Sequence, residues 1–338
     1  ADMRYSKKRT ASSGLTIALA SLVVLVGLGL LLWRPWSGKK YEGNLKFYCA
    51  AGMTRPVTEI IENYQGEFPK VSIKPNFGGS GEMISSMVAA QGEGDLYLSA
   101  DSFHMEKAKE KGLIAETIPV AKIHPVLVIN RESEGEIESI TELKHLLRSE
   151  LTVILGAETT AVGRVTRDVL RDVGLWEKVT NRKEGKNVTG ATVNDVAIKV
   201  GTTRKSVGIV WDITAIQHKS KLKVIDIPNL KLVSQQIWIG VLAKSKQPTQ
   251  ALRFARYLAA ENKGLMVFRS FHFTPTPDAD TWEKEPEIVL AAGAMLQDGI
   301  EKTVNAFAER EGVKVTTAYA GCGILVGDMK ILQGKNEK

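Results

Sequence analysis

Cysteine and histidine are scarce in this chain of 338 residues. Cys49 and Cys322 are its two cysteines, too few for a disulfide framework or a cysteine-rich metal site. The five histidines are scattered along the chain and lack the spacing that is typical of metal ligands. We therefore expect no metal site built from these side chains.

The signatures of common catalytic sites are also absent from the sequence. The glycine-rich segment 78–81 does not match the phosphate-binding loop G-x-x-x-x-G-K-[ST], and G-G-S-G-E is not the nucleophile elbow G-x-S-x-G. Asp95 and Asp101 flank a predicted strand, where capping or loop roles are more common than acid–base catalysis. Because no pair of nucleophile and base can be named, we predict that the protein is not an enzyme.

Positive charge is lacking outside the first 40 residues. The formal net charge of +7 contains +6 from residues 1–40, so residues 41–338 are close to neutral. Binding to nucleic acid requires a clustered basic surface. We therefore expect no nucleic acid partner.

One long uncharged hydrophobic run occurs, at residues 15–33. As a helix it would span about 28 Å, close to the hydrocarbon core of a membrane at about 30 Å. Trp33 and Trp36 lie at its end, where aromatic rings favour the membrane interface. A cleaved signal peptide is the alternative, although its apolar core is usually about 7–15 residues long. The run predicts an uncleaved N-terminal anchor over residues 1–40, and the flanking basic residues favour a body outside the cytoplasmic membrane.

Short apolar strands alternate with helical patterns through the rest of the chain. Residues 45–51 are typical of a buried strand, and Val57, Ile60, Ile61 and Tyr64 then recur at helical spacing. Further strands are predicted at residues 71–75, 95–100, 126–130, 151–155, 207–211 and 237–242. Strands that are joined by helices form right-handed βαβ units. The pattern predicts an α/β fold with mostly parallel sheets flanked by helices.

Two predicted strands end in small residues directly before a helix. One end is A-A-G-M-T at residues 50–54, and the other is G-G-S-G at residues 78–81. Ligands of open α/β sheets lie beyond the carboxyl ends of strands, and the free N–H groups of a helix N-terminus attract anions. Ser80 adds a hydroxyl donor. The two loops predict an anion site; tight turns with an N-cap residue are the alternative interpretation.

The sequence also repeats itself. Residues 49–87 align without gaps on residues 291–329 at a constant offset of 242, with nine identical pairs. This is more identity than average residue usage gives by chance. We predict that residues 281–338 are the truncated start of a second domain, which follows a linker rich in Pro and Asp at 274–286.

Several segments, taken in order, resemble the periplasmic molybdate- and tungstate-binding proteins of ABC importers. They are F-Y-C-A-A-G-M, F-G-G-S-G-E-M, D-L-Y-L-S-A-D, G-A-E-T-T-A-V-G, T-V-N-D-V and G-I-V-W-D-I-T-A. The resemblance covers residues 45–275 and implies a two-lobed, type II periplasmic-binding-protein-like fold over residues 41–280. Lobe one would comprise residues 41–122 and 236–280, and lobe two residues 123–235, with two crossing strands as the hinge.

The resemblance also implies which residues bind the ligand. In that family, backbone N–H groups and uncharged hydroxyls hold the oxyanion. The implied ligand-binding residues of this chain are Gly52, Met53, Ser80, Thr160, Val193 and Trp211. Gly52 stands where the family usually has serine, and Trp211 stands where it often has tyrosine. Tryptophan donates one hydrogen bond and accepts none. In the second copy, Cys322 stands in the place of Ser80.

The function implied by the resemblance is extracytoplasmic (periplasmic) solute binding. The protein would capture molybdate or tungstate and pass it to the permease of an ABC importer, with its two lobes closing on the ligand. No cofactor is implied, and a metal is present only as part of the bound oxyanion. Two alternatives stay open: a binder of another solute such as phosphate or an iron complex, and a ligand-sensing ectodomain of a membrane-anchored protein.

Overall fold

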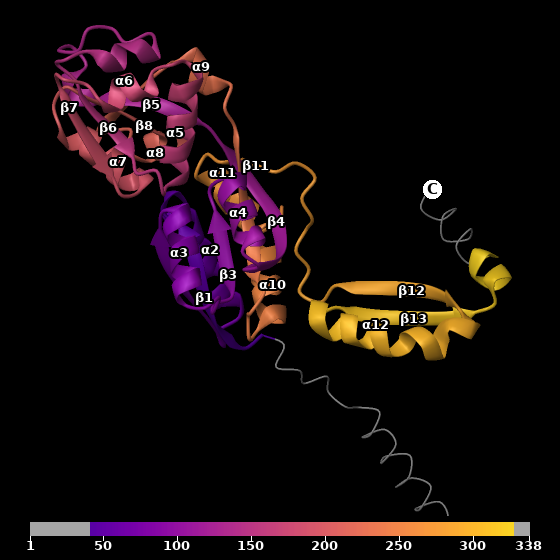
Figure 1. Ribbon diagram of the computed structural model, residues 1–338. Helices are drawn as coiled ribbons and strands as arrows, with labels where there is room; N and C mark the ends of the chain where they lie inside the picture. The colour runs from indigo at the N-terminus through magenta and orange to yellow at the C-terminus, as the bar shows by residue number, and fades with distance from the viewer. Residues whose placement is uncertain (1–40, 328–338) are drawn as a thin grey trace, which may run out of the picture. The chain divides into compact units, whose positions relative to one another are not determined.

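The computed structural model describes residues 41–327, which form two α/β lobes followed by a C-terminal βαβ unit (Figure 1). The predicted anchor over residues 1–40 and the last residues of the predicted second copy lie outside this range. Within residues 41–327, no helix combines the length and the hydrophobicity that crossing a membrane requires.

The first lobe is built on a six-stranded sheet with the strand order β11-β4-β10-β3-β1-β2. Its strands are β1 (Gly43–Ala50), β2 (Val71–Gly78), β3 (Leu96–Ser99), β4 (Ile114–Ile123), β10 (Gln235–Leu242) and β11 (Thr274–Pro275). The helices that contact this sheet are α2 (Thr54–Glu67), α3 (Ser80–Ala89), α4 (Ser102–Glu110), α10 (Pro248–Leu258) and α11 (Gly264–Ser270).

The second lobe is built on a five-stranded sheet with the strand order β7-β6-β8-β5-β9. Its strands are β5 (Pro125–Asn130), β6 (Thr152–Gly156), β7 (Lys186–Gly190), β8 (Ser206–Trp211) and β9 (Leu222–Ile225). Its helices are α5 (Ala161–Asp172), α6 (Trp176–Thr180), α7 (Val193–Thr202), α8 (Asp212–Gln217) and α9 (Pro228–Lys231).

The apolar spacing in the sequence accounts for the core elements of the first lobe. Val57, Ile60, Ile61 and Tyr64 are buried along one side of α2, which confirms the helix predicted there. Pro75 lies in β2, at the edge of the sheet, where its missing N–H interrupts no second strand ladder.

Both sheets are mixed, so the prediction of mostly parallel sheets is wrong. In the first lobe, β1 pairs in parallel with β2 and β3, whereas β10 is antiparallel to both β3 and β4. In the second lobe, β6 pairs in parallel with β7 and β8, whereas β5 is antiparallel to β8 and β9. The antiparallel strands β5 and β10 each enter their sheet by a direct crossing from the other lobe, and not through a right-handed helical crossover.

Two short connections carry the chain between the lobes. One residue, His124, separates β4 from β5, and residues 232–234 join α9 to β10. The two connections touch, because His124 Nδ1 lies 2.9 Å from the carbonyl oxygen of Val233. On the lobe-two side, the Asp212 N–H donates to the His124 carbonyl at 2.8 Å, which fixes the end of β8 against the same connection.

The C-terminal unit consists of β12 (Glu287–Gly293), η4 (Ala294–Leu296), α12 (Gln297–Glu311) and β13 (Lys314–Ala320). Its succession of strand, 3₁₀ turn, helix and parallel strand matches that of β1, η1 (Ala51–Met53), α2 and β2. However, η4 begins one residue later than the offset of 242 predicts, so the gapless alignment does not hold at this turn. The assignment of this unit to a second solute-binding domain stays a prediction.

Candidate functional site

A small cavity lies where loops of the two lobes meet. Its volume is about 20 Å³, just above the roughly 10–15 Å³ that one water molecule needs, so in this closed arrangement it is a small space enclosed by both lobes. The first lobe contributes Ala50, Ala51, Gly52, Gly78, Gly79, Ser80 and Ala100; the second contributes Thr160, Ala161, Val162, Thr192, Val193 and Trp211. Among the described residues, no charged side chain lines this cavity.

The structure brings together five of the six ligand-binding residues that the sequence implied. Gly52, Ser80, Thr160, Val193 and Trp211 all line the cavity. Met53 does not line it and is fully buried in the hydrophobic core that includes the first lobe. The two glycine-bearing strand ends therefore converge on one site, although they are separated along the chain by the whole of α2.

Three helices begin at the cavity. Ser80, Ala161 and Val193 are the first residues of α3, α5 and α7, and each of them lines the cavity. The first N–H groups of an α-helix have no partner within the helix, and the N-terminal end of the helix carries a partial positive charge. The converging N-termini therefore offer hydrogen-bond donors and a positive potential without any basic side chain.

The Ser80 hydroxyl is oriented by Ala100, the residue that follows β3. Ser80 is buried, and its Oγ accepts a hydrogen bond from the Ala100 N–H at 3.3 Å. The Ser80 carbonyl accepts from the Tyr97 hydroxyl at 2.9 Å, which fixes the main chain of this residue. Because Oγ is occupied as an acceptor by Ala100, its own proton is available to donate to a guest in the cavity.

The Thr160 hydroxyl is used within its own loop. It donates to the Ala157 carbonyl at 2.7 Å and accepts from the Gly163 N–H at 2.9 Å, as the N-cap of α5. The donor that this loop presents to the cavity is therefore the main-chain N–H of Ala161. The sequence prediction named Thr160 in this loop and not Ala161. A threonine directly before a helical apolar pattern is typical of an N-cap, and this signal would have indicated that the Thr160 hydroxyl is used within its own loop.

Gly52 and Trp211 fit each other. A Cβ atom at Gly52 would lie 3.4 Å from Trp211 Cδ1 and 3.3 Å from Val193 Cγ1, which is a tight approach. Trp211 is 1% exposed and ends β8 at the cavity. Val193 and Trp211 thus pack closely around Gly52, and a side chain at this position would press on Val193 Cγ1.

Hydrogen bonds join the lobes on two sides of the cavity. The Gly81 N–H donates to the Thr159 carbonyl at 2.9 Å, and Asn194 Nδ2 donates to the Ala51 carbonyl at 2.9 Å. A Cβ atom at Gly81 would lie 2.7 Å from the Thr159 oxygen, so only glycine allows this approach. The lobes are closed over the cavity in this arrangement.

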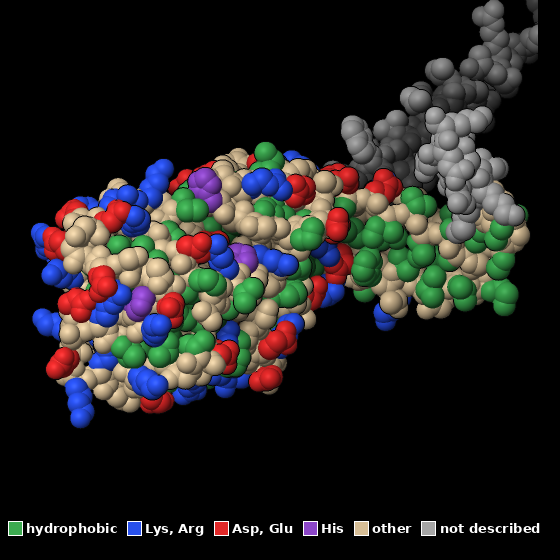
Figure 2. Space-filling view, turned by 90° about the horizontal axis from the view of Figure 1, so that it is seen from above, with side chains coloured by type: hydrophobic (Ala, Val, Ile, Leu, Met, Phe, Trp, Pro, Cys, Tyr) green, Lys and Arg blue, Asp and Glu red, His purple; other side chains and the backbone are tan. Residues whose placement is uncertain are grey.

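One face of the lobes has a mixed distribution of charge (Figure 2). Figure 2 shows Lys and Arg side chains interspersed with Asp and Glu on the face that it draws. Exposed hydrophobic side chains gather instead on the C-terminal unit, where Met295 is 98% and Val289 is 70% exposed. The charged side chains of the lobes form many exposed ion pairs, such as Lys221 with Glu132.

The two-lobed fold is that of solved periplasmic binding proteins. The periplasmic binding protein P5PA is similar with a TM-score of 0.60 at 12% identity, covering 72% of this chain and 89% of that one. The periplasmic molybdate-binding protein of Azotobacter vinelandii has a TM-score of 0.54 at 15% identity, covering 68% and 98%. Iron-bound HitA from Pseudomonas aeruginosa has a TM-score of 0.55 at 15% identity, covering 72% and 89%. At these identities the similarity shows the fold alone.

Two sequence relatives have related functions. YvgL of Bacillus subtilis (strain 168), provisionally described as an ABC transporter substrate-binding lipoprotein, is 26% identical over 259 residues, which are 76% of this chain and 95% of the relative. The molybdate-binding protein ModA of Mycobacterium tuberculosis (strain H37Rv) is 23% identical over 252 residues, 73% of this chain and 93% of the relative. These relatives are solute-binding proteins and not enzymes, which confirms the prediction that this protein is not an enzyme.

A sequence model of a protein family also matches this chain. It describes bacterial extracellular solute-binding proteins and matches residues 45–274, more than half of the chain. The matched range begins in β1 and ends at β11, so it covers both sheets that meet at the cavity. The chain belongs to the family of bacterial extracellular solute-binding proteins, and it is a solute-binding protein of the ABC-importer type.

Proposed function

We propose that this protein captures a small, fully deprotonated tetrahedral oxyanion, molybdate or tungstate, outside the cytoplasmic membrane and delivers it to the permease of an ABC importer. The observation that carries the proposal is the chemistry of the cavity. Its described lining offers N–H groups at three helix N-termini, the Ser80 hydroxyl and the Trp211 indole, and it includes no charged side chain.

Neutral donors are sufficient to hold a dianion when each of its oxygens is hydrogen-bonded. A hydrogen bond to a charged group contributes about 1.5–3 kcal/mol. Five to seven such bonds are enough for micromolar or tighter binding, about −8 kcal/mol, after the cost of association. The partial positive charges of α3, α5 and α7 add to this stabilisation.

The absence of carboxylates from the described lining of the cavity favours an anion without protons. Hydrogen phosphate keeps a proton at neutral pH, and that proton requires an acceptor such as a carboxylate. The described lining includes no Asp or Glu side chain, and the indole of Trp211 cannot accept a hydrogen bond. Molybdate, tungstate and sulfate carry no proton at this pH, so the lining suits all three, and the size of the ligand-bound cavity would separate the two larger anions from sulfate.

The lining also disfavours direct ligation of iron. Iron capture uses anionic or imidazole ligands, and the cavity lining includes no Tyr, His, Asp or Glu. Within residues 41–327, no group of three or more His, Cys, Asp or Glu side chains is arranged to hold a metal ion.

Isothermal titration calorimetry on the full chain tests the proposal. We expect one molybdate or tungstate to bind per chain with micromolar or tighter affinity, sulfate to bind more weakly, and phosphate to give no heat. Absence of heat with molybdate, tungstate and sulfate would refute the proposal.

We extend the proposal to the N-terminal anchor, which lies outside the described residues, and to a second domain start at residues 281–338. The uncharged run at 15–33 supports an anchored protein, and the βαβ succession at 287–320 supports a second domain start. Membrane fractionation with and without residues 1–40 tests the anchor: the full chain should sediment with membranes and the shortened chain should not.

A further inference from the structure

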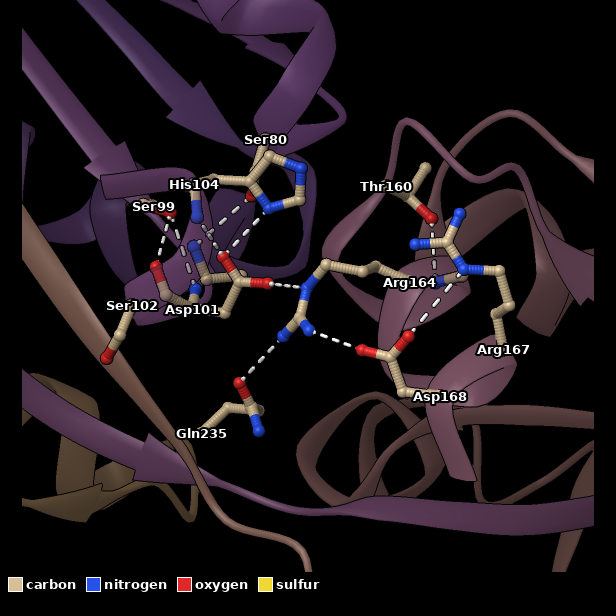
Figure 3. A network of polar contacts seen from close by, with 12 residues as sticks. Ser80, Ser99, Asp101, Ser102, His104, Thr160, Arg164, Arg167, Asp168 and Gln235 are labelled. Atoms are coloured by element: carbon tan, nitrogen blue, oxygen red, sulfur yellow. Dashed lines mark hydrogen bonds and ion pairs between the residues drawn. The ribbon is translucent and has the colours of Figure 1, made fainter. Parts of the chain in front are cut away.

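An ion pair joins the two lobes beside the cavity. Arg164 lies on α5 of the second lobe, and its Nε donates to Oδ2 of Asp101 in the first lobe at 3.1 Å (Figure 3). The Asp101 side chain is 0% exposed and the Arg164 side chain 14% exposed. The pair is therefore buried, and both charges would be transferred to water if the lobes separated.

Arg164 contacts three parts of the molecule at once. Besides Asp101, its NH1 donates to Asp168 on its own helix at 2.6 Å, and its NH2 donates to Gln235, the first residue after the second interlobe connection, at 3.3 Å. Its guanidinium carbon also lies 4.8 Å from the ring centre of Phe103 on α4 of the first lobe. The planar guanidinium of arginine can donate to several acceptors at once in this arrangement, whereas the ammonium of lysine cannot.

Asp101 needs the other lobe to complete its hydrogen bonds. Its Oδ1 accepts from the N–H and from Nδ1 of His104, at 2.9 and 2.8 Å, within the first lobe. Its Oδ2 accepts a hydrogen bond from Arg164 Nε of the second lobe. In the closed arrangement, removal of Arg164 would leave a buried carboxylate oxygen without a donor, which is strongly unfavourable.

Asp101 and Arg164 both lie close in sequence to residues that line the cavity. Asp101 directly follows Ala100, whose N–H holds the Ser80 hydroxyl. Arg164 lies one helical turn after Ala161, and its N–H donates to the Thr160 carbonyl at 3.0 Å. Closing the lobes on a guest thus brings Arg164 and Asp101 together.

We propose that Arg164 and Asp101 are positioning residues for anion capture, forming an interlobe ion pair in the closed state that strengthens binding without touching the anion. This inference rests on the proposed function. It follows that loss of the pair lowers the population of the closed state, reduces affinity and accelerates release, while the encounter with the anion is unchanged.

The chain provides a matched control on the same helix. Arg167 also lies on α5 and is paired, but its partners Glu158 and Asp168 both belong to the second lobe. Arg164→Met and Arg167→Met therefore remove the same charge from neighbouring turns, and only the first breaks a contact between lobes.

Binding of sodium molybdate to the full chain in detergent is the first measurement. Arg164→Met should raise Kd about tenfold or more, through a faster dissociation rate at an unchanged association rate. Arg167→Met should stay within about twofold of the wild type. In a double-mutant cycle, adding Asp101→Asn to Arg164→Met should cost little further affinity. Equal effects of the two arginine variants, or additive effects in the cycle, would overturn the proposal.

Pulsed electron paramagnetic resonance measures closure itself. Spin labels at Lys74→Cys in the first lobe and Lys183→Cys in the second, in a Cys322→Ser background, report the interlobe distance. Arg164→Met should increase the open population, with and without molybdate, and Arg167→Met should not. If the wild type binds no oxyanion, the proposed function fails, yet the ligand-free distances still test the ion pair; identical distributions for both variants would refute it.

A conservative variant separates positioning from folding. If Arg164→Met loses its folded circular-dichroism spectrum, Arg164→Lys takes its place in both experiments. Lysine keeps the charge but cannot contact Asp101, Asp168 and Gln235 together. We expect faster release than in the wild type; an unchanged release rate would contradict the inference.

Discussion

At the scale of single residues, the cavity combines small size with neutral donors. Ser80 has its hydroxyl oriented by Ala100, and Gly52 packs closely against Val193 and Trp211. None of the described lining side chains carries a charge. Affinity in such a site depends on each donor separately, because no Lys or Arg compensates when one is lost.

Ser80→Ala should weaken molybdate binding about tenfold or more, since one hydrogen bond to a charged guest contributes about 1.5–3 kcal/mol. Calorimetry of the variant measures the loss. Ser85→Ala is the control on the same helix, because the Ser85 hydroxyl donates to the Gly81 carbonyl on an exposed part of α3. Unchanged affinity in Ser80→Ala would mean that the anion binds elsewhere.

The sequence indicated which loops meet at the cavity, whereas the roles of their residues in ligand binding stay predictions. Gly52, Ser80, Val193 and Trp211 stand at loop positions that motifs and helix starts indicate, and the structure brings them to one cavity. Met53 has the same position in sequence, yet its side chain turns into the core. Local sequence does not determine which residue after the end of a strand faces the cavity, because that depends on how the following turn packs.

At the scale of secondary-structure elements, the site depends on how helices begin. The caps Gly79, Thr160 and Thr192 precede α3, α5 and α7, and each leaves the first N–H of its helix directed at the loop. Thr160 and Thr192 both use their hydroxyl to accept a main-chain N–H, from Gly163 and Asp195 respectively. Capping and anion binding are therefore linked in these helices.

Thr160→Ala should lower the free energy of unfolding by about 1 kcal/mol through loss of the N-cap, and should also weaken molybdate binding because the Ala161 N–H is less well held. Urea unfolding and calorimetry give the two quantities. Thr160→Ser keeps the capping oxygen and should restore both. If Thr160→Ala lost affinity at unchanged stability and Thr160→Ser did not restore it, a direct role of the threonine side chain would be indicated instead.

The elements that the sequence predicted are those with clear local periodicity. The strand at 45–51 and the helix with Val57 and Tyr64 are examples, and both lie in the core. By contrast, β4 was not predicted, since most of its residues are partly buried or exposed and its sequence lacks strict alternation. Strand direction was also missed: β5 and β10 are antiparallel because the chain crosses between lobes, a non-local event without a local signal.

At the scale of the whole molecule, closure is stabilised by contacts between distant residues. Arg164 and Asp101 are 63 positions apart, and Asn194 and Ala51 are 143 apart. No spacing rule connects such pairs, so they are found only once the lobes are placed. Among these contacts, the one between Arg164 and Asp101 is an ion pair and so responds to pH.

Acidification should weaken the contribution of Asp101 to stability. Burial raises the pKa of Asp101, but hydrogen bonds from His104 and the charges of His104 and Arg164 outweigh burial and hold this pKa below its usual value. A lowered folded-state pKa means that the stabilisation is fully present above the unfolded value of about 3.9 and is lost as pH falls through the folded value.

Urea unfolding as a function of pH checks this expectation. The wild type should lose stability on the acid side more steeply than Asp101→Asn, whose amide has no such titration but keeps an oxygen for the N-cap of α4. Curves that stay parallel down to acid pH would show that Asp101 does not contribute to the decline.

The bond between His124 and Val233 has a consequence for how this protein opens. Because this bond ties together the two connections that run between the lobes, we expect the lobes to turn about one axis rather than to slide past each other. One hinge angle would then describe the change from the open, ligand-free state to the closed, ligand-bound state. A single interlobe distance, measured across the opening of the cavity, would then report whether the protein is open or closed.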